Sequence, residues 1–323
     1  MKAAAIYKNG KQPHYADFPE PTVQENDHLL VSVKAVAITQ FEKARATGAH
    51  YSSDTTTEIA SIIGGDGVFT LNDGTRVYAT GASGTMAEKA IIDKKRMVKI
   101  PDQLDDVTAA ALPNAVIGAA MGLRFKGDIQ EGDVVLINGA TGFTGRVAVQ
   151  LAKYYGAKKV IVTGRNAQSL QDLLSIGADK IISLLQNDQA LAEQLKDAHT
   201  ETPFNVVIDY LWGSSAEIIL ASLKGKGAFT AKTRYVSVGS LAGDSIQLSA
   251  MMLRSVDLQL SGSGLGSWSR PQVHLLTTEI LPQMFALAAE GKLKVDTIAV
   301  SLDSIAQHWD AVVPDGKRLV VVI

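Results

Sequence analysis

Cysteine is absent from this sequence of 323 residues. Without cysteine there is no disulfide framework, no thiolate nucleophile and no zinc site with cysteine ligands. The six histidines are scattered, and none shows the close spacing of a metal-binding motif such as HExxH. Chemistry that depends on thiols or on a cysteine-bound metal is therefore excluded, and no metal site is predicted.

Long runs of one charge and uninterrupted apolar runs are also lacking. The 31 Lys and Arg residues are interspersed with 33 Asp and Glu residues, giving a formal net charge of −2. Nucleic acids and membrane surfaces are bound by concentrated basic faces, so neither is expected as a partner. The most apolar segment, Val107 to Leu123, contains Pro113 and Asn114 and is predicted to be too short to span a membrane. Because the N-terminus also lacks the apolar stretch of a signal peptide, a cytoplasmic location is the default expectation.

The chain is long enough for two domains, and its residue pattern changes near Asp106. Before Asp106, short β-like runs alternate with glycine-rich turns, which is typical of a small antiparallel β domain. The predicted elements there are strands at Ala3 to Tyr7, His28 to Ala37, Gly74 to Tyr78 and Met86 to Ile92, and a short helix at Gln40 to Thr47. A helix from Val107 to Gly122 is predicted to connect this domain to the next.

The second part of the chain alternates strands with helices, which predicts a parallel sheet of right-handed β-α-β units. Its first strand, Val134 to Asn138, is an apolar run of the kind found in strands buried on both faces. Further strands are predicted at Lys159 to Thr163, Lys180 to Ser183, Asn205 to Asp209 and Arg234 to Val238. Helical spacing returns from Pro271 to Ala289, and the strand-like run Arg318 to Ile323 is expected to return to the first domain.

The most informative segment is a glycine-rich turn between the strand Val134 to Asn138 and a helix. It reads Gly139-Ala140-Thr141-Gly142-Phe143-Thr144-Gly145 and departs from GxGxxG in having Ala140 at the place of the first glycine. Such a turn lets backbone N–H groups approach a pyrophosphate, and the helix N-terminus adds partial positive charge. Because the motif opens a series of β-α-β units, it predicts a dinucleotide site. A structural glycine turn that binds nothing is the alternative.

The end of the next strand predicts which dinucleotide is bound. NAD sites usually carry an Asp or Glu there, whereas this chain has Gly164-Arg165-Asn166. The missing carboxylate removes repulsion against a 2′-phosphate, and the planar guanidinium of Arg165 is suited to bind one. We therefore expect NADPH to be preferred over NADH, with a merely solvated Arg165 as the alternative.

The whole chain resembles the medium-chain dehydrogenase/reductase superfamily, in its zinc-free quinone oxidoreductase branch. The resemblance rests on ordered segments that include VKAVAITQFEKARATGAHY, IIGGDGVF, EGDVVLINGATGFTGRVAVQLAKYYGAKKV and DGKRLVVVI. It implies an α/β fold, with a GroES-like β-rich domain plus a doubly wound, parallel-sheet Rossmann domain. The implied boundaries are a GroES-like catalytic part at 1–118, a Rossmann NADP-binding domain at 119–262 and a return to the catalytic domain at 263–323.

The segments that hold zinc in metal-dependent relatives are altered in this chain. Those relatives place a cysteine near Thr39 and a GHE motif near Gly64-Gly65-Asp66, so both a cysteine and a histidine ligand are replaced. The resemblance therefore implies a zinc-independent enzyme that transfers hydride from NADPH to a quinone or related conjugated carbonyl in the interdomain cleft. Tyr51 is the nearest match to a tyrosine that serves as proton donor in related reductases. Packing against the substrate is its alternative role.

The resemblance implies further contacts to cofactor and substrate. Thr39 and Asn114 are candidates to contact the nicotinamide ribose, and Thr39, Tyr51 and Trp212 are candidates to line the substrate site. For Trp212, a buried aromatic residue of the core is the alternative. Lys317 is a candidate phosphate contact, with simple solvation as its alternative. Ends of the later strands are expected to line the cofactor, because doubly wound sheets bind ligands there; these positions are Tyr210, Leu211, Val238, Gly239, Gly262 and Ser263.

Two other functions stay open on the same scaffold. One is a 2-alkenal or enoyl-thioester reductase, which its preferred acceptors would distinguish from a quinone reductase. The other is a non-catalytic sensor or structural protein that binds NADPH without oxidising it. The family also implies a homodimer, and the alternating Leu, Met and Val residues of Ser245 to Gly262 predict an edge strand for its interface.

Overall fold

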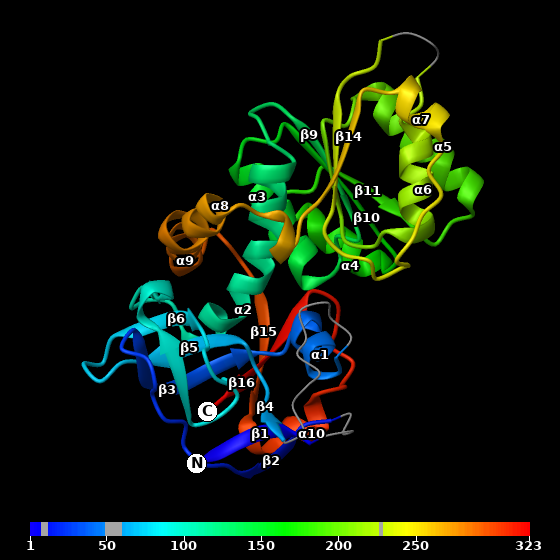
Figure 1. Cartoon of the computed structure of the whole chain (residues 1–323). Coiled ribbons are helices and arrows are strands. Elements are labelled where there is room, and N and C mark those ends of the chain that lie inside the picture. The colour runs from blue at the N-terminus through cyan, green and yellow to red at the C-terminus, as the bar shows by residue number, and fades with distance from the viewer. Residues whose placement is uncertain (8–11, 49–59, 226–228) are drawn as a thin grey trace. The chain divides into compact units, whose positions relative to one another are not determined.

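The structure is a computed structural model that describes residues 1–7, 12–48, 60–225 and 229–323 (Figure 1). The chain forms two compact units, one of residues 115–276 and one of residues 1–114 together with 277–323. The first contains a parallel sheet with connecting helices, and the second is rich in antiparallel strands. The predicted fold class, a β-rich domain plus a doubly wound parallel-sheet domain, is confirmed.

In the unit of residues 115–276, six parallel strands lie in the order β11-β10-β9-β12-β13-β14. The strands are β9 (Val134–Asn138), β10 (Lys159–Gly164), β11 (Lys180–Ser183), β12 (Val206–Asp209), β13 (Thr233–Ser237) and β14 (Leu258–Gly262). The helices are α3 (Phe143–Tyr154), α4 (Ala167–Leu174), α5 (Asp188–Glu201), α6 (Gly213–Ser222) and α7 (Ala250–Ser255), with the 3₁₀ turn η3 (Leu265–Ser267). The chain order reverses between β9 and β12, which is the switch point at which such sheets bind ligands.

The central strand β9 is buried along its whole length. Its side chains Val134 and Leu136 join a core with Ile161 of β10 and Val207 of β12. Burial of each such aliphatic side chain contributes about 1.5–3 kcal/mol relative to exposure to water. The core therefore holds the carboxyl end of β9, and the turn that follows it, in a fixed place in this unit.

In the other unit, the larger sheet has the order β15-β16-β3-β5-β6-β8, and β7 also pairs with β3. Its strands are β3 (His28–Ala37), β5 (Asp66–Thr70), β6 (Arg76–Thr80), β7 (Lys89–Asp93), β8 (Val98–Lys99), β15 (Asp296–Ser301) and β16 (Lys317–Val322). A smaller sheet contains β1 (Lys2–Ile6), β2 (His14–Asp17) and β4 (Ser61–Ile62). The C-terminal strand β16 pairs antiparallel with β3, so distant parts of the chain complete one sheet.

Short helical segments complete the fold. They are α1 (Gln40–Ala46), η1 (Lys94–Arg96), α8 (Arg270–Leu275), the π-helical η4 (Leu276–Ile280), α9 (Leu281–Ala289), η5 (Leu302–Ser304) and α10 (Ile305–His308). Helix α1 begins at Thr39, whose hydroxyl caps its first turn. Trp309, directly after α10, is almost fully buried in the core of the β-rich unit.

A helical segment runs from Asp106 to Lys126, as α2 (Asp106–Val116) followed by the π-helical η2 (Ile117–Lys126). By length and composition alone these 21 residues could cross a membrane, but 67% of the apolar window is buried inside the protein, as in a core helix. The predicted helix from Val107 to Gly122 is confirmed, and the helix continues through Pro113, but the prediction that the segment is too short to span a membrane is wrong by length. A proline inside a helix removes one backbone hydrogen bond, and the π-helical turns begin directly after α2.

Candidate functional site

The turn between β9 and α3 has a first residue whose conformation suits glycine. Gly139 has a φ of +81°, and a Cβ there would lie 2.7 Å from the side chain of Leu211. Thr163 of β10 holds the turn in place. The amide of Gly139 donates to its Oγ1 (3.1 Å), and the amide of Ala140 donates to its carbonyl oxygen (2.8 Å).

Helix α3 begins directly after this turn, and no side chain caps its first amides. Its N-cap residue, Gly142, is exposed. At Gly145, a Cβ would lie 2.5 Å from Cα and 2.6 Å from the carbonyl oxygen of Ala140, so only glycine allows the helix to lie this close to the turn. A 12-residue helix with uncapped amides behind a glycine-rich turn fits an anionic group such as a pyrophosphate.

The carboxyl end of β10 presents one exposed cation. The side chain of Thr141 lies 2.5 Å from where a Cβ on Gly164 would be, so the turn packs against the end of β10. Asn166 caps α4 by accepting the amide of Ser169 (2.9 Å), which engages its side-chain oxygen. Arg165 lies between these residues, is exposed, and makes no hydrogen bond or ion pair with a residue of the described chain. Its guanidinium is therefore available to an anionic ligand.

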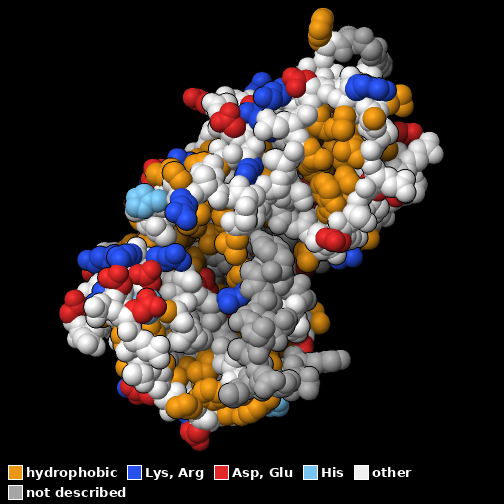
Figure 2. Space-filling view, viewed as in Figure 1, with side chains coloured by type: hydrophobic (Ala, Val, Ile, Leu, Met, Phe, Trp, Pro, Cys, Tyr) orange, Lys and Arg blue, Asp and Glu red, His pale blue; other side chains and the backbone are white. Residues whose placement is uncertain are grey.

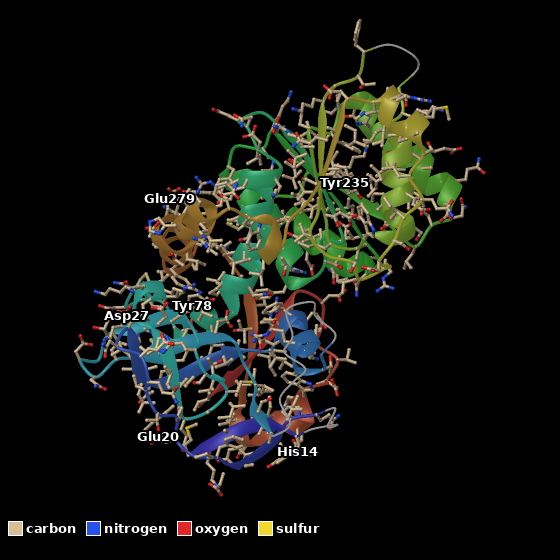
Figure 3. All side chains as sticks on the ribbon, viewed as in Figure 1. His14, Glu20, Asp27, Tyr78, Tyr235 and Glu279 are labelled. Atoms are coloured by element: carbon tan, nitrogen blue, oxygen red, sulfur yellow. The ribbon has the colours of Figure 1, made fainter. Side chains whose placement is uncertain are left out.

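Polar side chains near the ends of four neighbouring strands form a buried network beside the turn. Asn138 Nδ2 donates to Asp209 Oδ1 (2.8 Å), and Thr163 Oγ1 donates to Asn138 Oδ1 (2.6 Å). The hydroxyl of Tyr235, which Figure 3 shows at the parallel sheet, donates to Asp209 Oδ2 (2.6 Å). All four side chains are fully buried, and burial beside Asp209 raises the pKa of Tyr235 well above its usual value. Tyr235 thus remains a hydroxyl donor at physiological pH.

These network residues were missed when the site was predicted from the sequence. The signal that marks them is a polar residue at or next to the end of an otherwise apolar strand: Asn138 in VVLIN, Thr163 in KVIVTG and Asp209 in VVID. A polar group buried at such a position needs partners, because an unpaired one would cost several kcal/mol. The sequence contains this signal, but which residues become partners depends on strand order.

The turn after β12 contains three of the residues predicted to line the cofactor or the substrate: Tyr210, Leu211 and Trp212. Tyr210 is buried, and its hydroxyl donates to the carbonyl oxygen of Gly118 (3.2 Å), while burial raises its pKa well above the usual value. Leu211 covers Gly139, as described above. The ring of Trp212 is half-buried and packs edge-to-face on Tyr235, with centroids 6.2 Å apart, against the core of this unit.

The ends of β13 and β14 add the remaining predicted positions of this unit. Gly239 follows β13, and a Cβ on it would lie 2.8 Å from the carbonyl oxygen of Tyr210. Ser263 follows β14, is buried, and accepts a hydrogen bond from Trp268 Nε1 (3.1 Å). Val238 and Gly262 are half-buried and exposed, respectively. The structure therefore brings the glycine turn, the ends of β10 and β12 and Gly239 into mutual contact.

In the β-rich unit, side chains of α1 occupy the space beside Gly65. Thr39 is buried, and its Oγ1 accepts the amide of Glu42 (3.0 Å). A Cβ on Gly65 would lie 2.6 Å from Arg45 Nη1 and 2.8 Å from Glu42 Oε1, which themselves pair at 3.9 Å. Any side chain at position 65 would have to displace both groups.

The carboxyls of Glu42, which is buried, and Asp66, which is half-buried, interact electrostatically in this unit. Burial raises the pKa of Glu42 to about 7, and the charge of Asp66 adds to this effect, whereas Arg45 opposes it. Burial also raises the pKa of Asp66, although Asp66 accepts a hydrogen bond (2.6 Å) from the hydroxyl of Tyr78. Figure 3 labels Tyr78. Arg318 lies nearby, and burial lowers its pKa to about 10. The cluster is therefore able to gain or lose a proton near neutral pH.

The remaining predicted site residues do not belong to the unit that contains the glycine turn. Thr39, Asn114 and Lys317 belong to the β-rich unit, in which Asn114 is half-buried within α2 and Lys317 is exposed at the start of β16. Tyr51 lies outside the described residues. Their contacts to cofactor and substrate stay predictions.

Residues 144–279 match the family described as zinc-binding dehydrogenase. A protein of Emericella nidulans, named as a probable NADPH-dependent quinone reductase, is 26% identical over 96% of this chain and 96% of its own length. The NADPH-dependent alkenal/one oxidoreductase of Arabidopsis thaliana is 29% identical over 50% of this chain and 46% of its own length. The structure of Escherichia coli quinone oxidoreductase complexed with NADPH shares the fold, with a TM-score of 0.82 at 21% identity over 100% of both chains.

Proposed function

We propose that the chain is a member of the medium-chain dehydrogenase/reductase superfamily, in its quinone oxidoreductase branch, and that it acts as an NADPH-dependent oxidoreductase. It reduces a quinone or a related conjugated carbonyl, and it does so without zinc. The observation that carries the proposal is the glycine turn of residues 139–145, which fits a pyrophosphate at the N-terminus of α3. The similarity to a relative named as an NADPH-dependent quinone reductase supports the same reading.

The residues of this chain would hold NADPH by its phosphates. The uncapped amides of α3 would bind the pyrophosphate, and the close approach at Gly145 keeps those amides beside the turn. When bound, NADPH supplies the hydride for the reaction. Arg165 supports a preference for NADPH over NADH, since it is exposed, without a partner in the described chain, and next to a strand end that lacks a carboxylate.

Zinc independence is supported by what occupies the space beside Gly65. Arg45 and Glu42 fill the position that a histidine ligand would need, and the hydroxyl of Thr39 already accepts the amide of Glu42. Among the residues that the structure describes, no three His, Cys, Asp or Glu side chains gather where they would hold a metal ion. A quinone or enone acceptor suits such a site, because the charge developing on it is delocalised and needs no metal.

The substrate is proposed to bind in a cleft between the catalytic parts, residues 1–118 and 263–323, and the Rossmann domain, residues 119–262. Thr39, Tyr51 and Trp212 are the proposed lining residues. Tyr51 is the proposed proton donor, and an enolate would need this proton more than a quinol would. A cytoplasmic location is part of the same proposal.

A second candidate function is the reduction of an alkenal or a related enone on the same scaffold. It is favoured by the 29% identity to the NADPH-dependent alkenal/one oxidoreductase of Arabidopsis thaliana, which covers half of this chain. Both candidates use the same cofactor site. They differ in the acceptor and in how strongly turnover depends on Tyr51.

The test is steady-state oxidation of NADPH and of NADH with a para-quinone and with an aliphatic enone, with a metal chelator present throughout. We expect turnover that resists the chelator and is faster with NADPH. The ratio of the two acceptors then chooses between the candidates. Loss of activity in the chelator would contradict zinc independence, and NADPH binding without turnover of any acceptor would point to a non-catalytic role.

The parallel sheet also supports the homodimer that the family implies. Strand β14 forms the outer edge of the sheet in the described chain, with Leu260 exposed on it and Met251 and Leu253 exposed on α7. Figure 2 shows apolar side chains gathered near β14 and α7. An edge strand with exposed apolar residues is a template for pairing with a second copy. Light scattering at micromolar concentration should give twice the mass of 34.3 kDa, and a monomeric mass would refute the dimer.

A further inference from the structure

Asp209, the last residue of β12, has a carboxylate that is fully buried and bonded only to neutral donors in the described chain. Its Oδ1 accepts from Asn138 Nδ2 (2.8 Å) and from the amides of Leu211 (2.8 Å) and Trp212 (3.1 Å). Its Oδ2 accepts from the hydroxyl of Tyr235 (2.6 Å). Three donors at Oδ1 and one at Oδ2 stabilise this buried carboxylate by hydrogen bonds alone, without a cation.

The bonds of Asp209 reach the glycine turn through two further side chains. Asn138 Oδ1 accepts from Thr163 Oγ1 (2.6 Å), and Thr163 Oγ1 accepts the amide of Gly139 (3.1 Å). Asn138 Nδ2 also donates to Ser215 Oγ (3.0 Å) in the first turn of α6. A continuous chain of bonds therefore links the start of the glycine turn to the carboxylate at the end of β12.

The two hydrogen bonds that Asp209 accepts from backbone amides hold a strained turn at residues 211–212. Trp212 has φ +58° and ψ −152°, a region that is essentially restricted to glycine. A residue persists there only where its surroundings over-determine it, and here the carboxylate accepts the amides of Leu211 and Trp212 together. The side chain of Leu211 in this turn lies 2.7 Å from where a Cβ on Gly139 would be. The position of the strained turn therefore determines how much space is available beside Gly139, the first residue of the glycine turn.

We propose that Asp209 is a positioning residue, which holds the strained turn at 211–212 and the glycine turn at 139–145 in the mutual arrangement that NADPH needs. The proposal rests on the proposed function, because it concerns the same cofactor site. Asp209 does not itself contact the cofactor in this scheme. It acts through Asn138 and Thr163 on one side and through Leu211 on the other.

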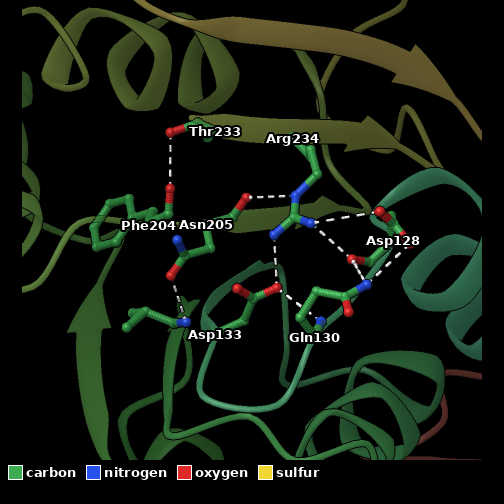
Figure 4. Close-up of polar contacts among 8 residues, drawn as sticks. Asp128, Gln130, Asp133, Phe204, Asn205, Thr233 and Arg234 are labelled. Carbon is green, nitrogen blue, oxygen red and sulfur yellow. Dashed lines mark hydrogen bonds and ion pairs between the residues drawn. The ribbon is translucent and has the colours of Figure 1, made fainter. Parts of the chain in front are cut away.

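The strand β13 offers a matched pair of variants, because two of its fully buried residues each donate one hydroxyl hydrogen bond. Tyr235 donates to Asp209 near the glycine turn, whereas Thr233 donates to the carbonyl oxygen of Phe204 (2.7 Å) at the opposite end of the sheet. Figure 4 shows Thr233 and Phe204 with the ion pair of Arg234 and Asp133 (2.6 Å). Tyr235→Phe and Thr233→Val each remove one buried bond, but only the first touches the Asp209 network.

The experiment compares both variants with the wild-type chain in three measurements. Thermal unfolding without cofactor reports stability, fluorescence titration gives the Kd for NADPH, and steady-state kinetics with a saturating quinone separate the KM for NADPH from kcat. One buried hydrogen bond corresponds to a few-fold to about tenfold change in an equilibrium constant. We expect both variants to melt at lower temperature, but only Tyr235→Phe to raise the Kd and KM for NADPH, by about fivefold, with kcat within twofold.

A second pair tests the carboxylate itself. In Asp209→Asn the oxygen still accepts the two backbone amides, and the new amino group can donate to the oxygen of Tyr235, so the Kd should rise by less than about threefold. Asp209→Ala removes these bonds and should raise the Kd by more than about tenfold. If Asp209→Ala does not fold, the Kd for NADPH of Tyr235→Phe still tests the proposal.

Two results would overturn the proposal: a Kd of Tyr235→Phe within twofold of wild type, or an equal rise in Thr233→Val. Either would mean that the network supports stability alone. Failure of the proposed function looks different, because the wild-type chain itself would then show no saturable binding of NADPH.

Discussion

Replacing Gly145 by alanine tests whether the close contact between α3 and the glycine turn is required. The added Cβ would lie 2.5 Å from Cα, 2.6 Å from the carbonyl oxygen and 2.7 Å from the carbonyl carbon of Ala140. Carbon atoms in good contact are about 3.5–4.0 Å apart, so the methyl group intrudes by about 1 Å. All three neighbours are backbone atoms, which cannot rotate away. The helix or the turn must therefore shift.

The cost of that shift sets the expected magnitude. Overpacking of this kind costs roughly 1–3 kcal/mol, which lowers Tm by about 2–4 °C per kcal/mol for a domain of 150–250 residues. The same shift moves the first amides of α3 away from the pyrophosphate. Because 1.4 kcal/mol corresponds to tenfold in affinity, we expect the Kd for NADPH to rise by at least about tenfold.

The assay combines thermal unfolding without cofactor with fluorescence titration of NADPH. Gly266→Ala is the control, because a Cβ on Gly266 meets nothing within 4 Å and its backbone conformation suits any residue. Gly266→Ala should change stability by less than about 0.5 kcal/mol and leave the Kd unchanged. If Gly145→Ala matched this control in both Tm and Kd, the reasoning about the close contact would be refuted.

Two further predictions concern single charged residues. Arg165→Ala should raise the Kd for NADPH by about tenfold and leave that for NADH within twofold, because a charge-assisted contact to the 2′-phosphate is lost; equal weakening of both cofactors in parallel titrations would contradict this role. The pKa of Glu42 is raised to about 7 in the folded protein, against 4.5 as its ordinary value, so the folded state holds this proton more tightly than the unfolded state. Stability from Glu42 is therefore present below about pH 4.5 and is lost as pH rises through about 7, by up to about 3 kcal/mol. Glu42→Gln should flatten this decline in urea unfolding measured at a series of pH values, and an unchanged decline would show that other groups cause it.

The strands of the parallel sheet could be predicted from the sequence, because apolar runs of neighbouring residues indicate them. The strand Val134–Asn138 and the strand Lys180–Ser183 lie where the apolar runs predict them. The strands β5 (Asp66–Thr70) and β15 (Asp296–Ser301) were not predicted. β5 pairs with the distant strand β3 as well as with its neighbour β6, and β15 pairs with the C-terminal strand β16. The helix through Pro113 was predicted from its apolar residues, and its buried neighbours outweigh the local preference of proline.

The candidate site divides in the same way. The glycine turn between a strand and a helix could be predicted, because the spacing of its residues carries the signal, while the contacts of this turn and of Arg165 to NADPH stay predictions. Asp209, Asn138, Thr163 and Tyr235 come from four strands, and they become partners only through the order β10-β9-β12-β13. Likewise, the pair Arg45 and Glu42 fills the space beside Gly65 only because α1 and the segment before β5 are packed together.

By itself, the sequence determined the glycine turn between a strand and a helix, the absence of cysteine chemistry and the alternation that builds a parallel sheet, because each follows from the residues themselves. Tertiary structure alone decided which buried polar groups meet, which carboxyl keeps its proton and how the turn at Trp212 is strained. These features depend on distances between segments far apart in the chain. Such distances result from packing of the whole core and cannot be inferred from any local stretch of residues.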